Sequence, residues 1–296
     1  MATAFGKVIL LGEHAVVHDH PALAAGFSPG VEAHAQRAST LSLAVEPWGL
    51  SCVPGDQSDV GRALAALASA LDSDDAAVEA RVFLPSGGGL GSSAALGVAV
   101  ARALDEAQAR TRSVEALLAA VLAWERVFHG NPSGVDHTLA ALGGVGVYSR
   151  AGGLERLSAC ASLRLCLASS GESTRTRDMV ARVAALLDSQ RGWVDQVFQR
   201  IASLVGDAVA DLATGRLDAL GGAMNENQAL LTALGVSTER IDDLCAAALD
   251  AGAFGAKLTG GGGGGCVIAL AGEREGRVLE AWRSRGAVPC CVEVRP

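Results

Sequence analysis

The sequence predicts a folded protein that joins a β-sheet in its first part to a long helical region. Short apolar runs, some of them alternating, lie before residue 85 and are typical of strands. From Asp178 to about Leu249 the pattern is mostly helical, with breaks at glycines. Half of the 296 residues are hydrophobic, so the chain is long and apolar enough for two domains with a substantial core.

The early strands are followed by one packing helix. The strands contain apolar or alternating residues, and together they suggest an early antiparallel sheet. The helix has apolar residues at helical spacing. The expected early strands are Phe5–Leu11, Pro21–Ala24, Val31–Ala38 and Thr40–Val45, and the expected helix is Val60–Leu71. A further strand, Val78–Leu84, is expected after this helix.

A glycine-rich loop, Pro85–Ala95, links the strand that ends at Leu84 to a helix predicted over Ala94–Ala109. Glycines let the backbone approach a phosphate closely, and the first N–H groups of a helix lack intrahelical partners. The loop therefore predicts an anion site. It is neither a Walker A loop nor a G-x-G-x-x-G fingerprint. A helix N-cap after a flexible turn is the alternative.

Charged side chains border the first strand. Lys7 enters it, and taken alone this lysine is more typical of a solvated strand end. Glu13 and His14 leave the strand, where they could form an ordinary salt bridge or a turn. The residues by themselves leave these interpretations open.

Two carboxylates flank a tight turn after the helix predicted over Ser113–Phe128, for which Ser113 is the expected N-cap. Glu125 precedes the turn, and Asp136 lies in the short helix that opens after it. The two side chains could converge on one cavity. Ser133-x-x-Asp136 is also the spacing of a capping box, so Asp136 could equally serve only to start a helix.

The second half contains polar and glycine-rich segments between regular elements. Arg150–Glu155 is polar and is the expected domain boundary. Ser169–Arg177 could hold an anion or be a solvated loop. Asn225–Gln228 is a polar island that could face a substrate, although a solvated helix face is the main expectation. Ordering the six glycines of Gly260–Gly265 is costly, which predicts backbone close to a ligand or a second loop; a flexible hairpin tip is the alternative. The remaining strands are expected over Gly143–Ser149, Leu163–Ala168, Cys266–Leu270 and Ala287–Val294, with a helix over Glu273–Arg285.

Charge and cysteine content narrow the function class. The net charge of −8 gives no basic footprint, so neither nucleic acid nor an anionic membrane is an expected partner. No apolar run reaches the length of a membrane span and no signal-peptide layout is seen, so we expect a cytoplasmic protein. The seven cysteines are scattered without a C-x-x-C pair, and most are expected to be small buried residues.

Four segments together resemble the GHMP kinase superfamily, most closely its mevalonate kinase branch. They occur in the family's order, and their combination is far more specific than any one of them. The segments are Lys7–Val17, Pro85–Ala95, Glu125–Asp136 and Lys257–Cys266.

The resemblance implies an α+β, two-domain GHMP kinase fold. Residues 1–155 would form an N-terminal ATP-binding domain with a left-handed β-α-β unit, and residues 156–296 a ferredoxin-like C-terminal domain. It implies an ATP-dependent kinase that phosphorylates the 5-hydroxyl of mevalonate in isoprenoid precursor synthesis, with ATP and Mg²⁺ as cofactors. A small-molecule substrate is the implied partner, and a homodimer is left open.

The resemblance also implies roles for individual residues. Asp136 would accept the proton of the substrate hydroxyl, and Lys7 would stabilise the developing charge. The residues implied to wrap the ATP phosphates are Gly87, Gly88, Gly89, Leu90, Gly91, Ser92 and Ser93. Those implied to hold Mg²⁺ are Ser93 and Glu125, and those implied to orient mevalonate are Glu13, His14, Thr176 and Arg177.

The sequence departs from the family pattern at Asp19-His20, where a glycine and a basic or polar residue are more usual, and at Gly261, which replaces an alanine. Other GHMP small-molecule kinases, such as phosphomevalonate or homoserine kinase, are the main alternative. A non-catalytic nucleotide-binding relative is a second. A galactokinase is disfavoured because Ala15-Val16-Val17 stands where a sugar kinase would have Thr-Asp-Tyr.

Overall fold

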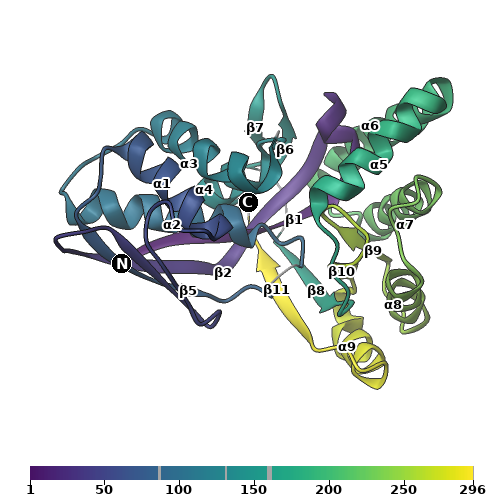
Figure 1. Cartoon of the computed structure of the whole chain (residues 1–296). Coiled ribbons are helices and arrows are strands. Elements are labelled where there is room, and N and C mark those ends of the chain that lie inside the picture. The colour runs from purple at the N-terminus through teal and green to yellow at the C-terminus, as the bar shows by residue number, and fades with distance from the viewer. Residues whose placement is uncertain (86–87, 131, 159–161, 296) are drawn as a thin grey trace. The chain divides into compact units, whose positions relative to one another are not determined.

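The computed structural model describes residues 1–85, 88–130, 132–158 and 162–295 (Figure 1). The chain divides into two compact units, which we describe separately. The first unit contains Met1–Lys7, Ser28–Ser86 and Gly91–Gly143. The second contains Val8–Phe27, Gly87–Leu90 and Gly144–Pro296. The domain boundary expected at residue 155 stays a prediction.

The first unit contains a sheet with one parallel pair. Its strands follow the order β4 (Leu50–Cys52), β3 (Ser42–Glu46), β5 (Ala76–Val82) and the second part of β2 (Ala22–Arg37). β3 pairs in parallel with β5, and the other two pairs are antiparallel. β5, which follows the packing helix, can pair in parallel with β3 because the helix between β3 and β5 provides the crossover that a parallel pair needs.

The two strands expected over residues 21–24 and 31–38 are a single strand, β2. The segment between them contains Gly26, Pro29 and Gly30. The backbone stays extended because it pairs with β1 (Ala2–Leu11) at close range. A Cβ at Gly30 would lie 2.3 Å from the backbone nitrogen of Gly6, so the absence of a side chain permits this approach.

The helices of the first unit agree closely with the sequence pattern. The Ser58 hydroxyl accepts a hydrogen bond from Gly61 N (2.9 Å), and the Ser113 hydroxyl accepts one from Ala116 N (3.2 Å), as N-cap side chains do. A Cβ at Gly97 would lie 2.8 Å from the buried Trp124 ring, so the second and third helices pack closely. The helices are α1 (Asp59–Leu71), α2 (Ser92–Ala107), α3 (Val114–His129) and α4 (Val135–Leu142).

The second unit has an antiparallel sheet. Its strands follow the order β2, β11 (Pro289–Val294), β8 (Leu163–Ser169), β10 (Cys266–Leu270) and β9 (Gly255–Thr259). β6 (Val145–Ser149) pairs with the first part of β2 and with β7 (Gly153–Arg156). The polar stretch Arg150–Glu155, expected to be a domain boundary, thus contains the turn between β6 and β7 and most of β7. The sequence pattern did not predict β7.

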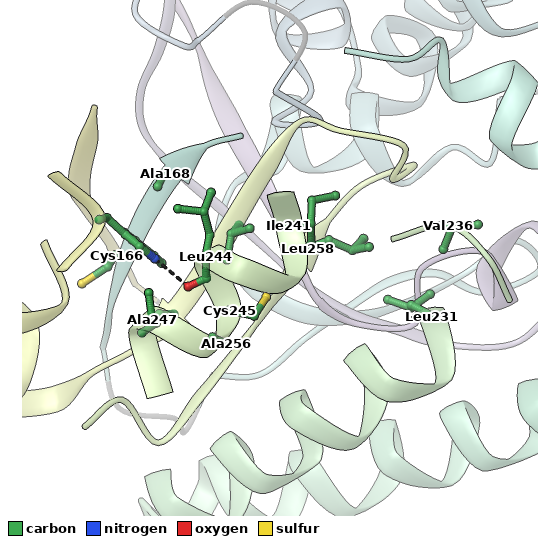
Figure 2. Close-up of a cluster of buried hydrophobic side chains, with 14 of the residues drawn as sticks. Cys166, Ala168, Leu231, Val236, Ile241, Leu244, Cys245, Ala247, Ala256 and Leu258 are labelled. Atoms are coloured by element: carbon green, nitrogen blue, oxygen red, sulfur yellow. Dashed lines mark hydrogen bonds between the residues drawn. The ribbon is translucent and has the colours of Figure 1, made fainter. Parts of the chain in front are cut away.

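Helices supply most of the remaining core of the second unit. Ile241, Leu244 and Leu258 lie in this core, shown in Figure 2, and Trp282 Nε1 donates to the carbonyl of Leu244 at 2.8 Å. No helix in the described part of the chain is long and apolar enough to cross a bilayer. The helices are η1 (Ala15–His18), α5 (Thr176–Ser189), α6 (Arg191–Thr214), α7 (Leu217–Ala233), α8 (Glu239–Asp250), η2 (Gly272–Arg274) and α9 (Glu275–Ser284).

The polar island Asn225–Gln228 is not the solvated helix face that we expected. Ala256 N donates to Asn225 Oδ1 (2.9 Å), and Leu258 N donates to Gln228 Oε1 (2.9 Å). β9 is the last strand in the order of the sheet, so its outer N–H groups need partners. The α7 amides therefore cap the edge of β9, a role that a helical pattern cannot reveal.

The six glycines form the turn between β9 and β10. A Cβ at Gly262, where φ is +75°, would lie 2.2 Å from the Val236 carbonyl oxygen, and one at Gly264 would lie 2.6 Å from that of Glu172. Cys266 N also donates to the carbonyl of Gly88 at 3.0 Å. The expectation of backbone packed against a second loop is confirmed.

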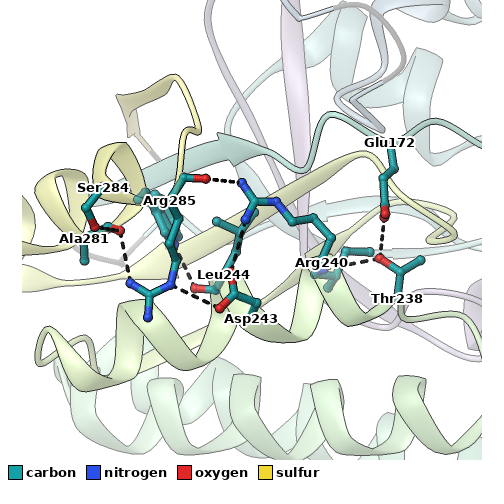
Figure 3. A network of polar contacts seen from close by, with 10 residues as sticks. Glu172, Thr238, Arg240, Asp243, Leu244, Ala281, Ser284 and Arg285 are labelled. Carbon is teal, nitrogen blue, oxygen red and sulfur yellow. Dashed lines mark hydrogen bonds and ion pairs between the residues drawn. The ribbon is translucent and has the colours of Figure 1, made fainter.

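Side chains fasten the segment before α5 to α8. Thr238, the N-cap of α8, donates to Glu172 at 2.6 Å (Figure 3). In the same network Arg240 and Arg285 both contact Asp243 at 3.1 Å. Because Gly265 N donates to the Glu172 carbonyl at 2.9 Å, this network also supports the glycine turn.

Most of the described cysteines are small buried residues, as expected. Cys290 is exposed and Cys291 is partly buried, while Cys160 lies outside the described residues. The buried cysteines are Cys52, Cys166, Cys245 and Cys266.

Candidate active site

The first unit brings Lys7 and Asp136 together. Lys7 Nζ lies 2.9 Å from Asp136 Oδ1, and the lysine side chain is almost fully buried while 29% of the Asp136 side chain is exposed. Asp136 lies in the first turn of α4, whose N-cap is Gly134 with φ +98°. Gly134 and not Ser133 is the cap of α4, and the Asp136 carboxylate contacts the Lys7 ammonium group.

Electrostatics keep this carboxylate ionised. Burial alone would raise the pKa of Asp136, but the Lys7 ammonium and the neighbouring His129 and His137 together lower that pKa below its ordinary value. An ionised carboxylate that is partly exposed beside a lysine is suited to accept a proton.

Glu125 and Ser93 lie beside this pair in the same unit. Ser93 Oγ donates to Glu125 Oε1 at 2.6 Å, and Trp124 Nε1 donates to the Ser93 carbonyl at 3.0 Å, which fixes the start of α2 against α3. Glu125 is 1% exposed, and burial, followed by the negative charge of Asp136, raises its pKa to about 8.

Ser93 and Glu125 fit a Mg²⁺ site. Hydroxyl and carboxylate oxygens are hard ligands of the kind that Mg²⁺ takes together with substrate phosphates. A cation beside Glu125 would offset the burial that disfavours its ionised form. Among the described residues there is no group of three or more His, Cys, Asp and Glu side chains that could hold a metal, so phosphate oxygens would have to complete the coordination.

The glycine-rich loop is described except for Ser86 and Gly87, which lie outside the described residues. In the first unit Gly91, with φ +74°, is the N-cap of α2, so Ser92 and Ser93 are its first residues and carry N–H groups at the start of the helix. A Cβ at Gly91 would lie 2.9 Å from Lys7 Cγ. The helix start and the lysine are therefore close neighbours, as an anion site requires.

The rest of the loop belongs to the second unit. The carbonyl of Gly88 accepts from Cys266 N, and Leu90 is 1% exposed. Gly89 has φ +70°, and a Cβ there would lie 2.6 Å from the Thr259 carbonyl oxygen. This part of the loop lies against the hairpin of β9 and β10, where only glycine leaves enough room.

The second unit holds the other predicted site residues. Glu13 is buried and forms an ion pair with Lys257. His14 Nε2 contacts the carbonyl oxygen of Gly261 at 2.9 Å, and a Cβ at Gly261 would lie 2.9 Å from Thr176 Cγ2. His14, Gly261 and Thr176 are thus neighbours, whereas Arg177 is exposed and pairs with Asp178 at 3.6 Å.

The His14 ring is neutral. Burial lowers its pKa to about 4, against a smaller opposite effect of the hydrogen bond to Gly261. A carbonyl can only accept, so Nε2 carries the proton and Nδ1 is left as the acceptor of the ring. This nitrogen is suited to accept from a hydroxyl.

Lys257 and Asn227 were missed by the motif-based reasoning. Lys257 is fully buried in β9, and Asn227 Oδ1 accepts from Gly12 N at 3.2 Å. A signal for Lys257 was available, because a lone lysine in an apolar strand is the same feature that singled out Lys7. Asn227 belongs to the polar island Asn225–Gln228, but the helical pattern of α7 does not indicate its contact with Gly12.

Two family profiles match the chain. The profile described as GHMP kinases N terminal domain matches residues 59–144, and the one described as GHMP kinases C terminal matches residues 208–288. The first contains Ser93, Glu125 and Asp136, and the second contains Lys257.

Relatives and solved structures extend the similarity to nearly the whole chain. A protein named mevalonate kinase from Pyrococcus horikoshii is 33% identical, over 99% of this chain and 95% of the relative. One of the same name from Aeropyrum pernix is 34% identical, over 93% and 89%. The crystal structure of L. major mevalonate kinase in complex with R-mevalonate has a TM-score of 0.87 at 27% identity, covering 99% of this chain and 95% of that one. These similarities confirm the predicted two-domain fold of mixed helices and strands.

Proposed function

This chain belongs to the GHMP kinase family and is an ATP-dependent phosphotransferase, and from that premise we propose that it phosphorylates the 5-hydroxyl of mevalonate. The reaction would supply isoprenoid precursors in the cytoplasm. The observation that carries the proposal is the contact of 2.9 Å between Lys7 and the partly exposed Asp136. The names of the relatives support the choice of acceptor.

Asp136 acts as the proton acceptor. It takes the proton of the primary hydroxyl as that oxygen forms a bond to the γ-phosphorus and the bond from this phosphorus to the β-phosphate oxygen breaks. ADP leaves, and Asp136 returns the proton to water. Lys7 stabilises the negative charge on the attacking oxygen and on the transferring phosphoryl group.

The start of α2 and the loop before it bind the phosphates. The residues proposed to bind them run from Gly87 to Ser93, and Ser93 with Glu125 would hold Mg²⁺. The ion would supply positive charge that neutralises phosphate oxygens. Phosphoryl transfer depends on positioning and charge neutralisation more than on covalent help, which suits this set of groups.

The acceptor is oriented by Glu13, His14, Thr176 and Arg177. The neutral His14 ring, with Nδ1 as its acceptor, is suited to a hydroxyl of the substrate. Glu13 is fully buried against Lys257, so it orients the acceptor indirectly, by holding the turn that carries His14. Thr176 lies beside Gly261 and so close to the His14 contact.

The test is ADP release measured with ATP and Mg²⁺ in the presence of mevalonate, phosphomevalonate, homoserine or galactose. We expect turnover with mevalonate alone. Turnover with another acceptor would replace the proposed substrate while leaving the reaction class intact. Nucleotide binding without turnover on any alcohol would instead favour a non-catalytic nucleotide-binding relative.

A further inference from the structure

The ion pair of Glu13 and Lys257 has an unusual location. Both side chains are completely buried, and Lys257 Nζ also donates to the carbonyl of Leu258 at 2.6 Å. Removing two charges from water costs several kcal/mol for each ion, and apolar residues of similar volume often serve stability as well or better. A gain in stability therefore explains this ion pair poorly, and its geometry indicates another role.

The pair anchors a strained turn. Glu13 stands between Gly12, with φ +112°, and His14, with φ +62° and ψ −48°. A residue other than glycine is strained in this region and persists there only where its surroundings impose the conformation. Such strain is commonly found at ligand-binding residues.

Three contacts in the second unit impose this conformation. Gly12 N donates to Asn227 Oδ1 at 3.2 Å, Glu13 pairs with Lys257, and His14 Nε2 donates to the carbonyl of Gly261 at 2.9 Å. Lys257 lies in β9 and Gly261 in the turn that follows it. One hairpin therefore holds both the carboxylate before the histidine and the histidine ring itself.

We propose that Lys257 is a positioning residue for the acceptor alcohol: through Glu13 it fixes the turn that presents His14 to the substrate. This inference rests on the proposed function, in which His14 orients the acceptor. Lys257 itself does not touch the substrate, because its ammonium group is enclosed by Glu13 and backbone carbonyls. Replacing Lys257 should therefore weaken the binding of the acceptor and leave the binding of ATP unchanged.

The test uses the double variant Glu13→Gln/Lys257→Met, which leaves neither charge buried alone. Steady-state kinetics should give a KM for the acceptor that rises about 10-fold or more, with the KM for ATP within about 2-fold of the wild-type value. The matched control is Arg200→Met/Glu226→Gln, which neutralises an exposed ion pair of the same unit, with contacts of 2.6 and 2.7 Å. We expect no change in either KM for this control.

A second readout follows the histidine directly. Nitrogen-15 NMR of the imidazole should report a neutral His14 ring with the proton on Nε2 in the wild-type protein. In the double variant we expect a mixture of tautomers. This measurement needs no turnover, so it tests the positioning of His14 even if the wild-type protein phosphorylates none of the acceptors and the proposed function fails.

Unchanged KM for the acceptor together with an unchanged His14 tautomer would overturn the inference and leave the pair with a structural role only. An equal rise in the KM for ATP would also overturn it. If the double variant does not fold, Lys257→Arg takes its place, because a planar guanidinium cannot reproduce the contacts of a buried ammonium. The KM measurements and the NMR of His14 are then made on Lys257→Arg, with the same expected results.

Discussion

Two lysine–carboxylate pairs in this chain carry the same charges in different surroundings. Lys7 and Asp136 lie at 2.9 Å, with 29% of the aspartate side chain exposed. Glu13 and Lys257 are both completely buried. A carboxylate that solvent can reach can exchange a proton and meet a substrate, whereas an enclosed carboxylate can only hold its neighbours in place. Under the proposed function, this difference in access suits the first pair to chemistry and the second pair to positioning.

The largest expected effect is the loss of catalysis in Asp136→Asn. We expect kcat to fall by about 10³-fold, because general base catalysis typically contributes 10²–10⁴-fold. ADP release at saturating substrate measures this, with Asp207→Asn, an exposed position on α6, as the control. Full turnover in Asp136→Asn would contradict the role of the first pair.

Replacing one lysine at a time should lower the free energy of unfolding by different amounts in the two pairs. Lys257→Met leaves Glu13 buried without its ion-pair partner and should cost about 3–5 kcal/mol of unfolding free energy. Lys7→Met should cost less, because water can reach Asp136, yet it should lower kcat by about 10²-fold or more. Urea unfolding and ADP release on both variants test this. Equal stability losses would remove the distinction drawn from burial.

Acid should weaken the second region through His14. Its pKa is about 4 in the folded protein and 6.5 in the ordinary state, so the stability linked to the neutral ring is fully present above pH 6.5 and is lost as the pH falls through about 4. The loss amounts to about 3 kcal/mol. His14→Asn keeps a residue that tolerates positive φ and lacks this titration. Urea unfolding at pH 7 and pH 4.5 should therefore show a smaller acid effect in His14→Asn, and an identical effect would argue against a neutral buried ring.

The smallest effect concerns the turn that accepts from His14. Gly262→Ala places a Cβ 2.2 Å from the Val236 carbonyl oxygen at a positive φ, and should cost about 1–3 kcal/mol of stability. Gly206→Ala, in the interior of α6 with open space around it, should be neutral or stabilising by about 0.5–1 kcal/mol. Thermal unfolding compares the two variants. A tolerated alanine at residue 262 would mean that the turn adapts easily.

The sequence alone predicted the elements whose signals are local. The N-cap at Ser113, the helices of the first unit and the strands around the six glycines follow from capping residues and periodicity. Motif order identified the family, and with it the residues now proposed for catalysis. These features depend on neighbours within about one turn of a helix or one strand, so they can be read along the chain.

The tertiary structure decided what depends on distant pairing. It joined two expected strands into β2, made the pair of β3 and β5 parallel, and placed the α7 amides along the edge of β9. It also enclosed Lys257 against Glu13, 244 positions earlier in the chain, while leaving Asp136 partly exposed to solvent. Sequence patterns state which residues are charged or apolar. The burial and the partners of a charged side chain arise when sheet register and helix packing bring remote segments together. They determine whether that side chain can take part in a reaction or only holds its neighbours in place.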